Sequence, residues 1–234
     1  MVTGLRKTSL GQIQFSRQSG FIKISKSNLH HIQAWIDFLR RDRYLCQIHK
    51  KNFMDQMAGL IKLFRYYRGL GERAMSQVSE DHLFARPDEN SNSIAVIVRH
   101  LSGNMLSRWT NFRTEDGEKE WRDRDSEFED PDWDTERLMQ YWKEGWDCLE
   151  NALSNIQDSE LNEIVYIRKE GHSIQEAIYR QLAHYAYHVG QIVYLSRMFS
   201  ESWKSLSIPK NESGRYNSEK FSGEKEIRHF TDRV

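Results

Sequence analysis

The chain has 234 residues, of which 38% are hydrophobic, and this is enough for one domain with a sizeable core. Its 34 basic residues balance its 34 acidic residues, so no overall charge favours binding to nucleic acid or to an anionic membrane. No apolar segment approaches the roughly 18 residues of a membrane-spanning helix, and the N-terminus lacks a secretory pattern, so we expect a soluble, cytoplasmic protein.

Residues 1 to about 50 are basic and rich in polar residues, and they show no sustained hydrophobic period. One stretch differs, because Leu29 to Arg41 (LHHIQAWIDFLRR) has the pattern of a short amphipathic helix. We expect residues 1–50 to be an irregular extension outside the native domain, with Met54 and Met57 as alternative starts of the natural chain.

The hydrophobic pattern becomes regular at Phe53. Apolar residues at steps of three and four predict a first helix that ends before Pro87, with a core face made of Phe53, Met57, Leu60, Phe64, Tyr67 and Leu70. A second helix begins near Ser93, where Ser and Asn residues supply N-caps. Its predicted core residues are Ile94, Ile97, Leu101, Met105 and Trp109.

Residues 114–133 are charged and aperiodic, and they predict a long connection. A third helix follows from Thr135, and its core face is rich in indole: Leu138, Trp142, Trp146, Leu149, Leu153 and Ile156. After a further connection, Ser173 and Glu176 have the spacing of a capping box. This predicts a fourth helix from Ile174 to about Phe199, after which the chain is polar.

Four amphipathic helices in about 150 residues predict an all-α fold, a four-helix bundle over residues 53–222 with a polar tail at 223–234. The connection between the second and third helices has about 20 residues, which is longer than a loop between antiparallel neighbours. We therefore expect a long crossover that makes these two helices parallel, in up-down-down-up order.

Two histidines, His184 and His188, lie four residues apart in the fourth helix, so both imidazoles project from one face. A third, His100, lies in the second helix. Three neutral imidazoles can hold one metal ion and leave a position open for water or substrate, as catalytic zinc sites do. The alternative is a solvated or hydrogen-bonded pair, since the motif lacks the glutamate that makes His-Glu-x-x-His specific.

Three polar residues lie about one helical turn from these histidines, and they are candidates to line the pocket or to support the ligands: Asn104, Gln181 and Gln191. Polar residues that satisfy one another inside the bundle are an equal alternative. The other histidines are expected at the surface, namely His30, His31, His49, His82, His172 and His229.

Other kinds of site find little support in the sequence. A di-iron bundle needs Glu-x-x-His on two helices, but this motif occurs only at Glu226 and His229. No Gly-rich phosphate loop, nucleophile elbow or Cys-x-x-Cys pair is present. The two cysteines, Cys46 and Cys148, are too isolated for a disulfide framework and lack an activating context.

Several segments together resemble the DinB-like superfamily, and specifically a branch of small, largely uncharacterised bacterial proteins: SNSIAVIVRHLSGNMLSRWTNF, DGEKEWRDRDSEFED, QLAHYAYHVGQIVYL and WKSLSIPK. The resemblance covers about residues 53–222. It implies an up-down-down-up bundle with a metal-binding triad of one histidine from the second helix and a His-x-x-x-His pair from the last. The matching positions are His100, His184 and His188.

The resemblance also implies a function, because some superfamily members are transferases or isomerases that use thiols such as bacillithiol or mycothiol. We expect a divalent-metal protein, with zinc or nickel, that acts as a thiol S-transferase on small electrophiles in detoxification or stress response. A non-catalytic metal-binding or stress-interaction protein is the first alternative, and a metal-dependent hydrolase is the second. The expected partners are a low-molecular-weight thiol and a small electrophile, and a second copy of the chain in a homodimer is a further candidate.

Overall fold

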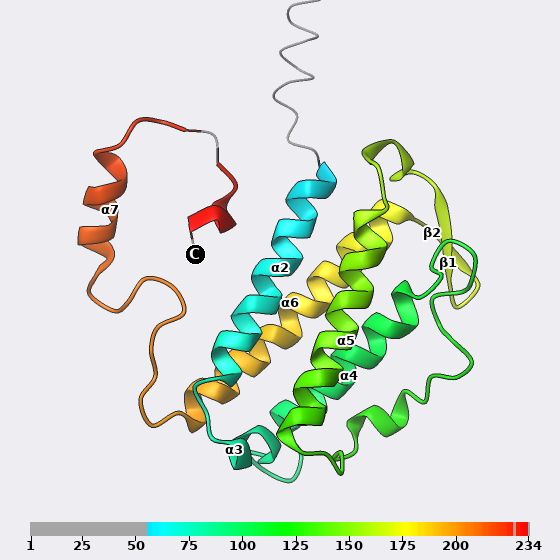
Figure 1. Cartoon of the computed structure of the whole chain (residues 1–234), viewed down its shortest axis with the longest axis horizontal. Coiled ribbons are helices and arrows are strands. Elements are labelled where there is room, and N and C mark those ends of the chain that lie inside the picture. Colours follow the sequence, from blue (N-terminus) through cyan, green and yellow to red (C-terminus); the bar gives the residue numbers. More distant parts are fainter. Residues whose placement is uncertain (1–55, 227, 234) are drawn as a thin grey trace, which may run out of the picture. The chain divides into compact units, whose positions relative to one another are not determined.

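The computed structural model describes residues 56–226 and 228–233 (Figure 1). Its contacts divide the chain into two units, Met1–Phe53 and Met54–Val234. The expected irregular extension over residues 1–50, with its amphipathic stretch and with His30, His31, His49 and Cys46, lies outside the described residues. Within the described part, no helix is both long and apolar enough to cross a membrane.

Four long helices form the bundle: α2 (Gln56–Met75), α4 (Ile94–Trp109), α5 (Thr135–Ser154) and α6 (Ile174–Phe199). In Figure 1, α2 and α6 run in one direction and α4 and α5 in the other, which is the predicted up-down-down-up order. The prediction of an all-α bundle is therefore confirmed.

The parallel packing of α4 and α5 is visible in two contacts. A Cβ on Gly145 would lie 2.8 Å from Ser102 Cα, so the absence of a side chain lets the two backbones approach closely. Further along both helices, Thr110 Oγ1 lies 3.6 Å from Cys148 Sγ. Both contacts advance in the same direction along the two helices, as the predicted crossover requires.

The core between the helices is aromatic. Trp142, Trp146, Tyr185 and Phe64 are among the largest fully buried side chains. Their rings meet edge to face, with centroids 5.3 Å apart for Trp142 and Trp146 and 6.0 Å apart for Trp146 and Tyr185. Each such ring removes about 150–250 Å² from water, so the indole-rich face predicted for the third helix is the centre of the bundle.

Short polar side chains cap three of the helices. Ser93 accepts a hydrogen bond from the Val96 N–H at the start of α4, and Asp134 does the same for α5. The predicted cap at Ser173 is present, since its hydroxyl accepts from the Glu176 N–H. The Glu176 carboxylate lies 3.3 Å from His172 Nδ1, and no hydrogen bond returns from it to the Ser173 N–H among the described bonds, so only this half of the capping box forms.

The predicted first helix is wrong in its extent. The structure has two helices there, α2 and the short α3 (Glu80–Phe84), separated by a turn over residues 76–79. Ser79 adopts an extended conformation before α3, with φ −70° and ψ 161°. Hydrophobic spacing did not show the break, because apolar residues on both sides of it, such as Met75 and Leu83, are buried in the same core.

The connection before α6 contains an antiparallel hairpin that the sequence analysis missed. Strands β1 (Ile164–Ile167) and β2 (Glu170–Ser173) pair with Ile164 opposite Ser173. The turn residues Arg168 and Lys169 have positive φ values of 55° and 65°. The Asp116 carboxylate accepts a hydrogen bond from the backbone N–H of each, at 2.7 Å, and so ties the turn to the crossover.

The crossover between α4 and α5 is likewise packed against the bundle. It contains a 3₁₀ turn, η1 (Asp125–Phe128). The Gly117 N–H donates to the Tyr166 carbonyl at 2.8 Å, which links the crossover to β1. Although its sequence is charged and aperiodic, this segment therefore makes specific contacts, and these lie around one end of the α4–α6 interface.

Two further segments contact α2. At its start, the 3₁₀ turn η2 (Asp158–Glu160) places the Asp158 carboxylate 2.9 Å from the N–H groups of Gln56 and Met57. After the exposed helix α7 (Ser213–Phe221), the 3₁₀ turn η3 (Phe230–Arg233) packs on α2, and Lys62 pairs with Asp232 at 2.7 Å. The polar tail thus includes an ordered contact with the bundle.

Candidate metal centre

Three imidazoles converge between α4 and α6. His100 comes from the middle of α4, and His184 and His188 come from successive turns of α6. One ring nitrogen of each lies within 4.8 Å of the others. The Nε2 atoms of His100 and His184 are 3.2 Å apart. The three imidazoles therefore lie close enough together to form one cluster.

The donor set fits a divalent ion. Ligand nitrogens at 2.0–2.1 Å from a tetrahedral ion are separated from one another by roughly 3.3–3.4 Å. The observed 3.2 Å between two Nε2 atoms is close to that separation. Among the described residues, no fourth His, Cys, Asp or Glu joins the group. The cluster could hold a metal ion and would leave part of its coordination open.

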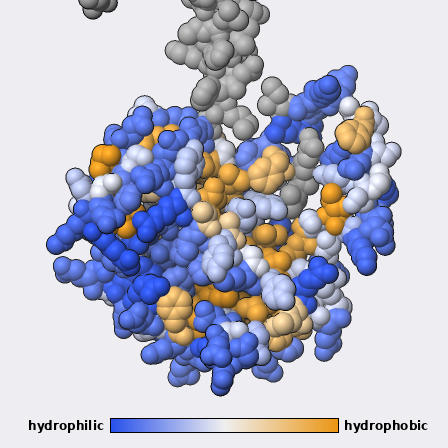
Figure 2. All heavy atoms as spheres, turned by 180° about the vertical axis from the view of Figure 1, so that it is seen from behind, coloured by the Kyte–Doolittle hydropathy of each residue, from blue (hydrophilic) through white to orange (hydrophobic). Residues whose placement is uncertain are grey.

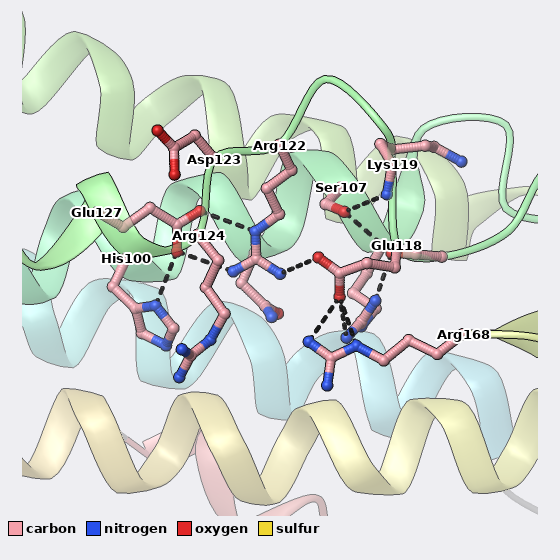
Figure 3. A network of polar contacts seen from close by, with 12 residues as sticks. His100, Ser107, Glu118, Lys119, Arg122, Asp123, Arg124, Glu127 and Arg168 are labelled. Carbon is pink, nitrogen blue, oxygen red and sulfur yellow. Dashed lines mark hydrogen bonds and ion pairs between the residues drawn. The ribbon is translucent and has the colours of Figure 1, made fainter.

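A buried carboxylate orients the first of these rings. His100 Nδ1 lies 2.9 Å from Glu127 Oε2, so Nδ1 carries the proton and donates it to the carboxylate, which leaves Nε2 free to face the other imidazoles. Arg122 binds the same carboxylate in bidentate fashion, with both hydrogen bonds at 2.8 Å. Figure 3 shows this chain from Arg122 through Glu127 to His100.

Glu127 reaches this position because of Gly103 on α4. A Cβ at Gly103 would lie 3.0 Å from Glu127 Cδ and closer still to one carboxylate oxygen. Burial acts to raise the pKa of Glu127, but the hydrogen bonds from His100 and Arg122 outweigh it and hold the pKa below its ordinary value. The Glu127 side chain is therefore an ionised carboxylate that accepts hydrogen bonds from His100 and Arg122.

Gln191 orients a second ring. Its Oε1 lies 2.7 Å from His188 Nδ1, so this nitrogen donates to the amide oxygen and Nε2 is again left for a ligand. The sequence analysis considered two roles for Gln191, lining the pocket or supporting a ligand, and this contact corresponds to the second.

The two imidazoles of α6 are held neutral. Burial lowers the pKa of His184 to about 3, and the neighbouring His188 and His100 add to the effect. Burial also lowers the pKa of His188, against the opposing influence of its hydrogen bond with Gln191. Because only a neutral imidazole can bind a metal, both rings are in the form that ligation requires at neutral pH.

The other two candidate supporting residues line a cavity beside the imidazoles. Asn104 is buried, and its Oδ1 accepts a hydrogen bond from the Tyr185 hydroxyl at 3.1 Å. Gln181 is 3% exposed, and its Oε1 has no donor among the described residues. The cavity has a volume of about 230 Å³ and is lined by His100, Asn104, Arg108, Arg122, Arg124, Arg168, Arg180, Gln181 and His184.

A larger cavity of about 700 Å³ lies elsewhere, between α6 and residues 87–92. It includes Gln191 but none of the three histidines. On the face shown in Figure 2, the side that carries the hairpin and the crossover is mainly hydrophilic with scattered hydrophobic residues, and more hydrophobic residues lie toward the middle of the view. The smaller cavity is therefore the one associated with the imidazole cluster.

Three of the histidines expected at the surface are partly or wholly covered. His82 stacks on Phe199 with ring centroids 4.9 Å apart. His172 has 14% of its side chain exposed, and His229 is 9% exposed and packs over Gly59. The surface prediction is wrong for His172 and His229, because these residues lie in the hairpin and directly before η3, and neither segment has a hydrophobic periodicity that would have shown their burial in the sequence.

The sequence analysis did not find Glu127, Arg122 or Gly103. Glu127 lies in a segment with many exposed charges, and nothing in its local sequence marks it as buried. The signal that was available is chemical, since a metal-binding histidine almost always donates its second N–H to a carboxylate or carbonyl. Cys148, as expected, is not activated, because burial raises the pKa of its thiol.

Comparison with known protein families matches residues 50–212 to the family described as "Protein of unknown function (DUF1572)". Among solved structures, the chain is similar to a DinB-like protein from Bacillus subtilis (YjoA), with 17% identity, a TM-score of 0.46, and coverage of 62% of this chain and 95% of that chain. No curated protein matches the sequence. Because the family match spans well over half of the sequence, the chain belongs to the DUF1572 family.

Proposed function

We propose that His100, His184 and His188 hold one divalent ion, zinc or nickel, and that the protein is a metal-dependent thiol S-transferase acting on small electrophiles. The observation that carries this proposal is the convergence of three imidazoles beside a cavity, with the Nδ1 atoms of two of them fixed by Glu127 and Gln191. Imidazole nitrogen is a good donor for zinc and nickel.

The site is built to keep its donors in place. Arg122 is only 3% exposed at its side chain and holds the Glu127 carboxylate, which in turn holds the His100 ring. On the other helix, Gln191 fixes His188. A bound divalent ion supplies Lewis acidity, which favours the deprotonated form of a thiol or water beside it. Three protein ligands with an open side are typical of catalytic sites and differ from closed structural ones.

The nucleophile in this proposal is a free thiol of low molecular weight, such as bacillithiol. The described part of the chain offers Cys148 as its own thiol, but this group is half-buried, contacts Thr110 and has a raised pKa. A thiol with a raised pKa is a poor nucleophile at neutral pH. The cavity beside the imidazoles is where an external thiol and its electrophile would be brought together.

The test is conjugation of bacillithiol to monochlorobimane by zinc-loaded protein. In this reaction the thiol sulfur bonds to the chloromethyl carbon, chloride leaves and the thiol proton passes to the buffer. We expect fluorescent conjugate to form faster than without protein, and His184→Ala to remove the acceleration. His82→Ala should keep it, because His82 contacts Ser79 and Phe199 and is not part of the cluster.

Equal acceleration by wild type and His184→Ala would contradict the proposal. If the wild type binds zinc through the three histidines but does not accelerate conjugation of bacillithiol or other small thiols, the proposal of transferase activity is wrong. The remaining functions for the site are then a non-catalytic metal protein and a hydrolase. Hydrolysis of activated esters that requires His184 would favour the second of these.

A further inference from the structure

The cavity beside the imidazoles is lined by five arginines and by no Asp or Glu among the described residues. Arg108 comes from α4, Arg122 and Arg124 from the crossover, Arg168 from the hairpin turn and Arg180 from α6. Four separate elements therefore bring guanidinium groups to one small space. Figure 3 shows Arg122 and Arg124 extending toward α6 on the same side as His100.

Nearby carboxylates neutralise only part of this charge. Glu118 is shared by three of the arginines, with N···O distances of 3.2 Å to Arg108, 3.3 Å to Arg122 and 3.0 Å to Arg168. Glu127 binds Arg122 and His100. Burial lowers the pKa of Arg108, and the nearby charge of Arg122 lowers it further, against the attraction of Glu118. The excess positive charge therefore contributes to the lowered pKa of Arg108, a group that lines the cavity.

Two of the arginines have their guanidinium groups largely available. Arg124 is half exposed; its guanidinium lies over the Phe128 ring, 5.0 Å from the centroid, and its ion pair is a loose one, with 3.6 Å to the exposed carboxylate of Asp125. Arg180 is exposed and has no hydrogen bond or ion pair within the described residues. Both line the cavity, and neither is needed to hold Glu118 or Glu127. The N–H groups of both side chains are therefore largely available to a ligand.

We propose that this arginine-lined cavity binds the carboxylate or phosphate group of a small anionic substrate, and that Arg124 and Arg180 are its principal contacts. Arginine is suited to this task, since its planar fork matches both groups in bidentate geometry. The volume of about 230 Å³ suits a small molecule, being just below the range of drug-sized sites. The inference rests on the proposed function in one respect, because it names the substrate class of the same site.

One buried group supports a ligand at this position. Gln181 lines the cavity next to Arg180, and its side-chain oxygen is buried without a donor among the described residues. Buried polar atoms are nearly always hydrogen-bonded. A substrate that carries a hydroxyl or N–H group beside its anionic group would supply the missing donor.

The test is calorimetric titration of the full-length protein with malonate and, separately, with inorganic phosphate at low ionic strength. Each titration is run on metal-free and on zinc-loaded protein. We expect saturable binding of at least one of the two anions to the metal-free protein, and which one binds identifies the chemistry. The double variant Arg124→Ala/Arg180→Ala should lose at least about tenfold in affinity, because charge-assisted hydrogen bonds are lost.

Arg197→Ala is the matched control, since Arg197 is also an exposed arginine of α6 but does not line the cavity. It should bind the anion as the wild type does. The double variant should still bind zinc, and metal-free His188→Ala, which removes a cluster imidazole that does not line the cavity, should still bind the anion, so failure of this inference and failure of the metal site are distinguishable. Absence of binding of both anions, or equal affinity of the double variant and the wild type, would overturn the inference.

Discussion

The two helices that carry the imidazoles and the crossover that covers them contribute different things to the site. Helices α4 and α6 supply the three donor rings, and regular helical geometry is enough to place His184 and His188 on one face. The crossover supplies Glu127, which binds the His100 ring, and Arg122, which binds Glu127 and lines the cavity, but these two cannot by themselves form the cluster. Changes on the helices should therefore abolish metal binding, whereas changes in the crossover should weaken it.

The largest effect is expected for the donors. Ions that bind only the folded chain stabilise it by about 2.7 kcal/mol when free metal is a hundredfold above its dissociation constant. His184→Ala should remove this metal-induced stabilisation, while His82→Ala should retain it. Thermal melts with zinc or nickel, with and without chelator, measure the difference. Equal metal-induced shifts in wild type and His184→Ala would mean that the ion binds elsewhere.

A smaller effect is expected in the crossover. Glu127→Gln keeps the size of the side chain but removes the charge that holds His100 and Arg122. We expect zinc affinity to fall by about 10–100-fold, as is usual for such supporting carboxylates. Glu129→Gln is the matched control, because Glu129 is an exposed residue of the same segment. Competition with a chelating dye gives the affinities. A Glu127→Gln variant that equals wild type would show that the crossover only covers the site.

The donors should also make the metal-free protein sensitive to acid. His184 has a pKa of about 3 in the folded chain because it is buried and lies beside His188 and His100, whereas the unfolded value is about 6.5. Its contribution to stability is thus complete above about pH 6.5 and is lost as pH falls toward 3, with a slope of up to about 1.4 kcal/mol per pH unit.

Denaturant titrations of metal-free protein between about pH 7 and 5 measure this slope. The His184→Gln variant lacks the titrating ring, so its stability should fall less steeply than that of wild type. The carboxylates titrate alike in both proteins and cancel in the comparison. Parallel curves would show that the imidazole is not kept neutral by the fold.

The smallest effect is expected at Gln191, which fixes a ring through one neutral hydrogen bond. Gln191→Leu should lower zinc affinity by no more than about tenfold, the low end for supporting residues. Gln175→Leu on the same helix, where Gln175 contacts Tyr179 and not the cluster, should leave it unchanged. If Gln191→Leu exceeded Glu127→Gln in its effect, the order of importance of the two supports would be reversed.

The same contrast explains which features could be predicted from the sequence. The common face of His184 and His188, the cap at Ser173 and the indole-rich face of α5 all follow from helical periodicity and capping chemistry. The placement of His100 opposite the pair came from the family resemblance and from its lying in a helix. These are local patterns in regular elements, and the structure contains each of them.

The crossover and the hairpin follow no such period. Glu127 is buried because Gly103 makes room for it and Arg122 neutralises it, and Gly103 lies on α4, away from the crossover that carries the other two. The hairpin turn is held by Asp116, about 50 residues before it. Pairings of this kind depend on tertiary contacts between charged side chains, and a charged segment looks the same in sequence whether it is solvated or packed.

The most direct test of the central claim is X-ray absorption at the zinc edge on tag-free, zinc-loaded protein, together with elemental analysis. The account predicts one zinc per chain, with a nitrogen shell at about 2.0–2.1 Å that includes three imidazoles. It also predicts that His100→Ala, His184→Ala and His188→Ala each lose the ion. A sulfur shell, or full zinc content in any of the three variants, would contradict it.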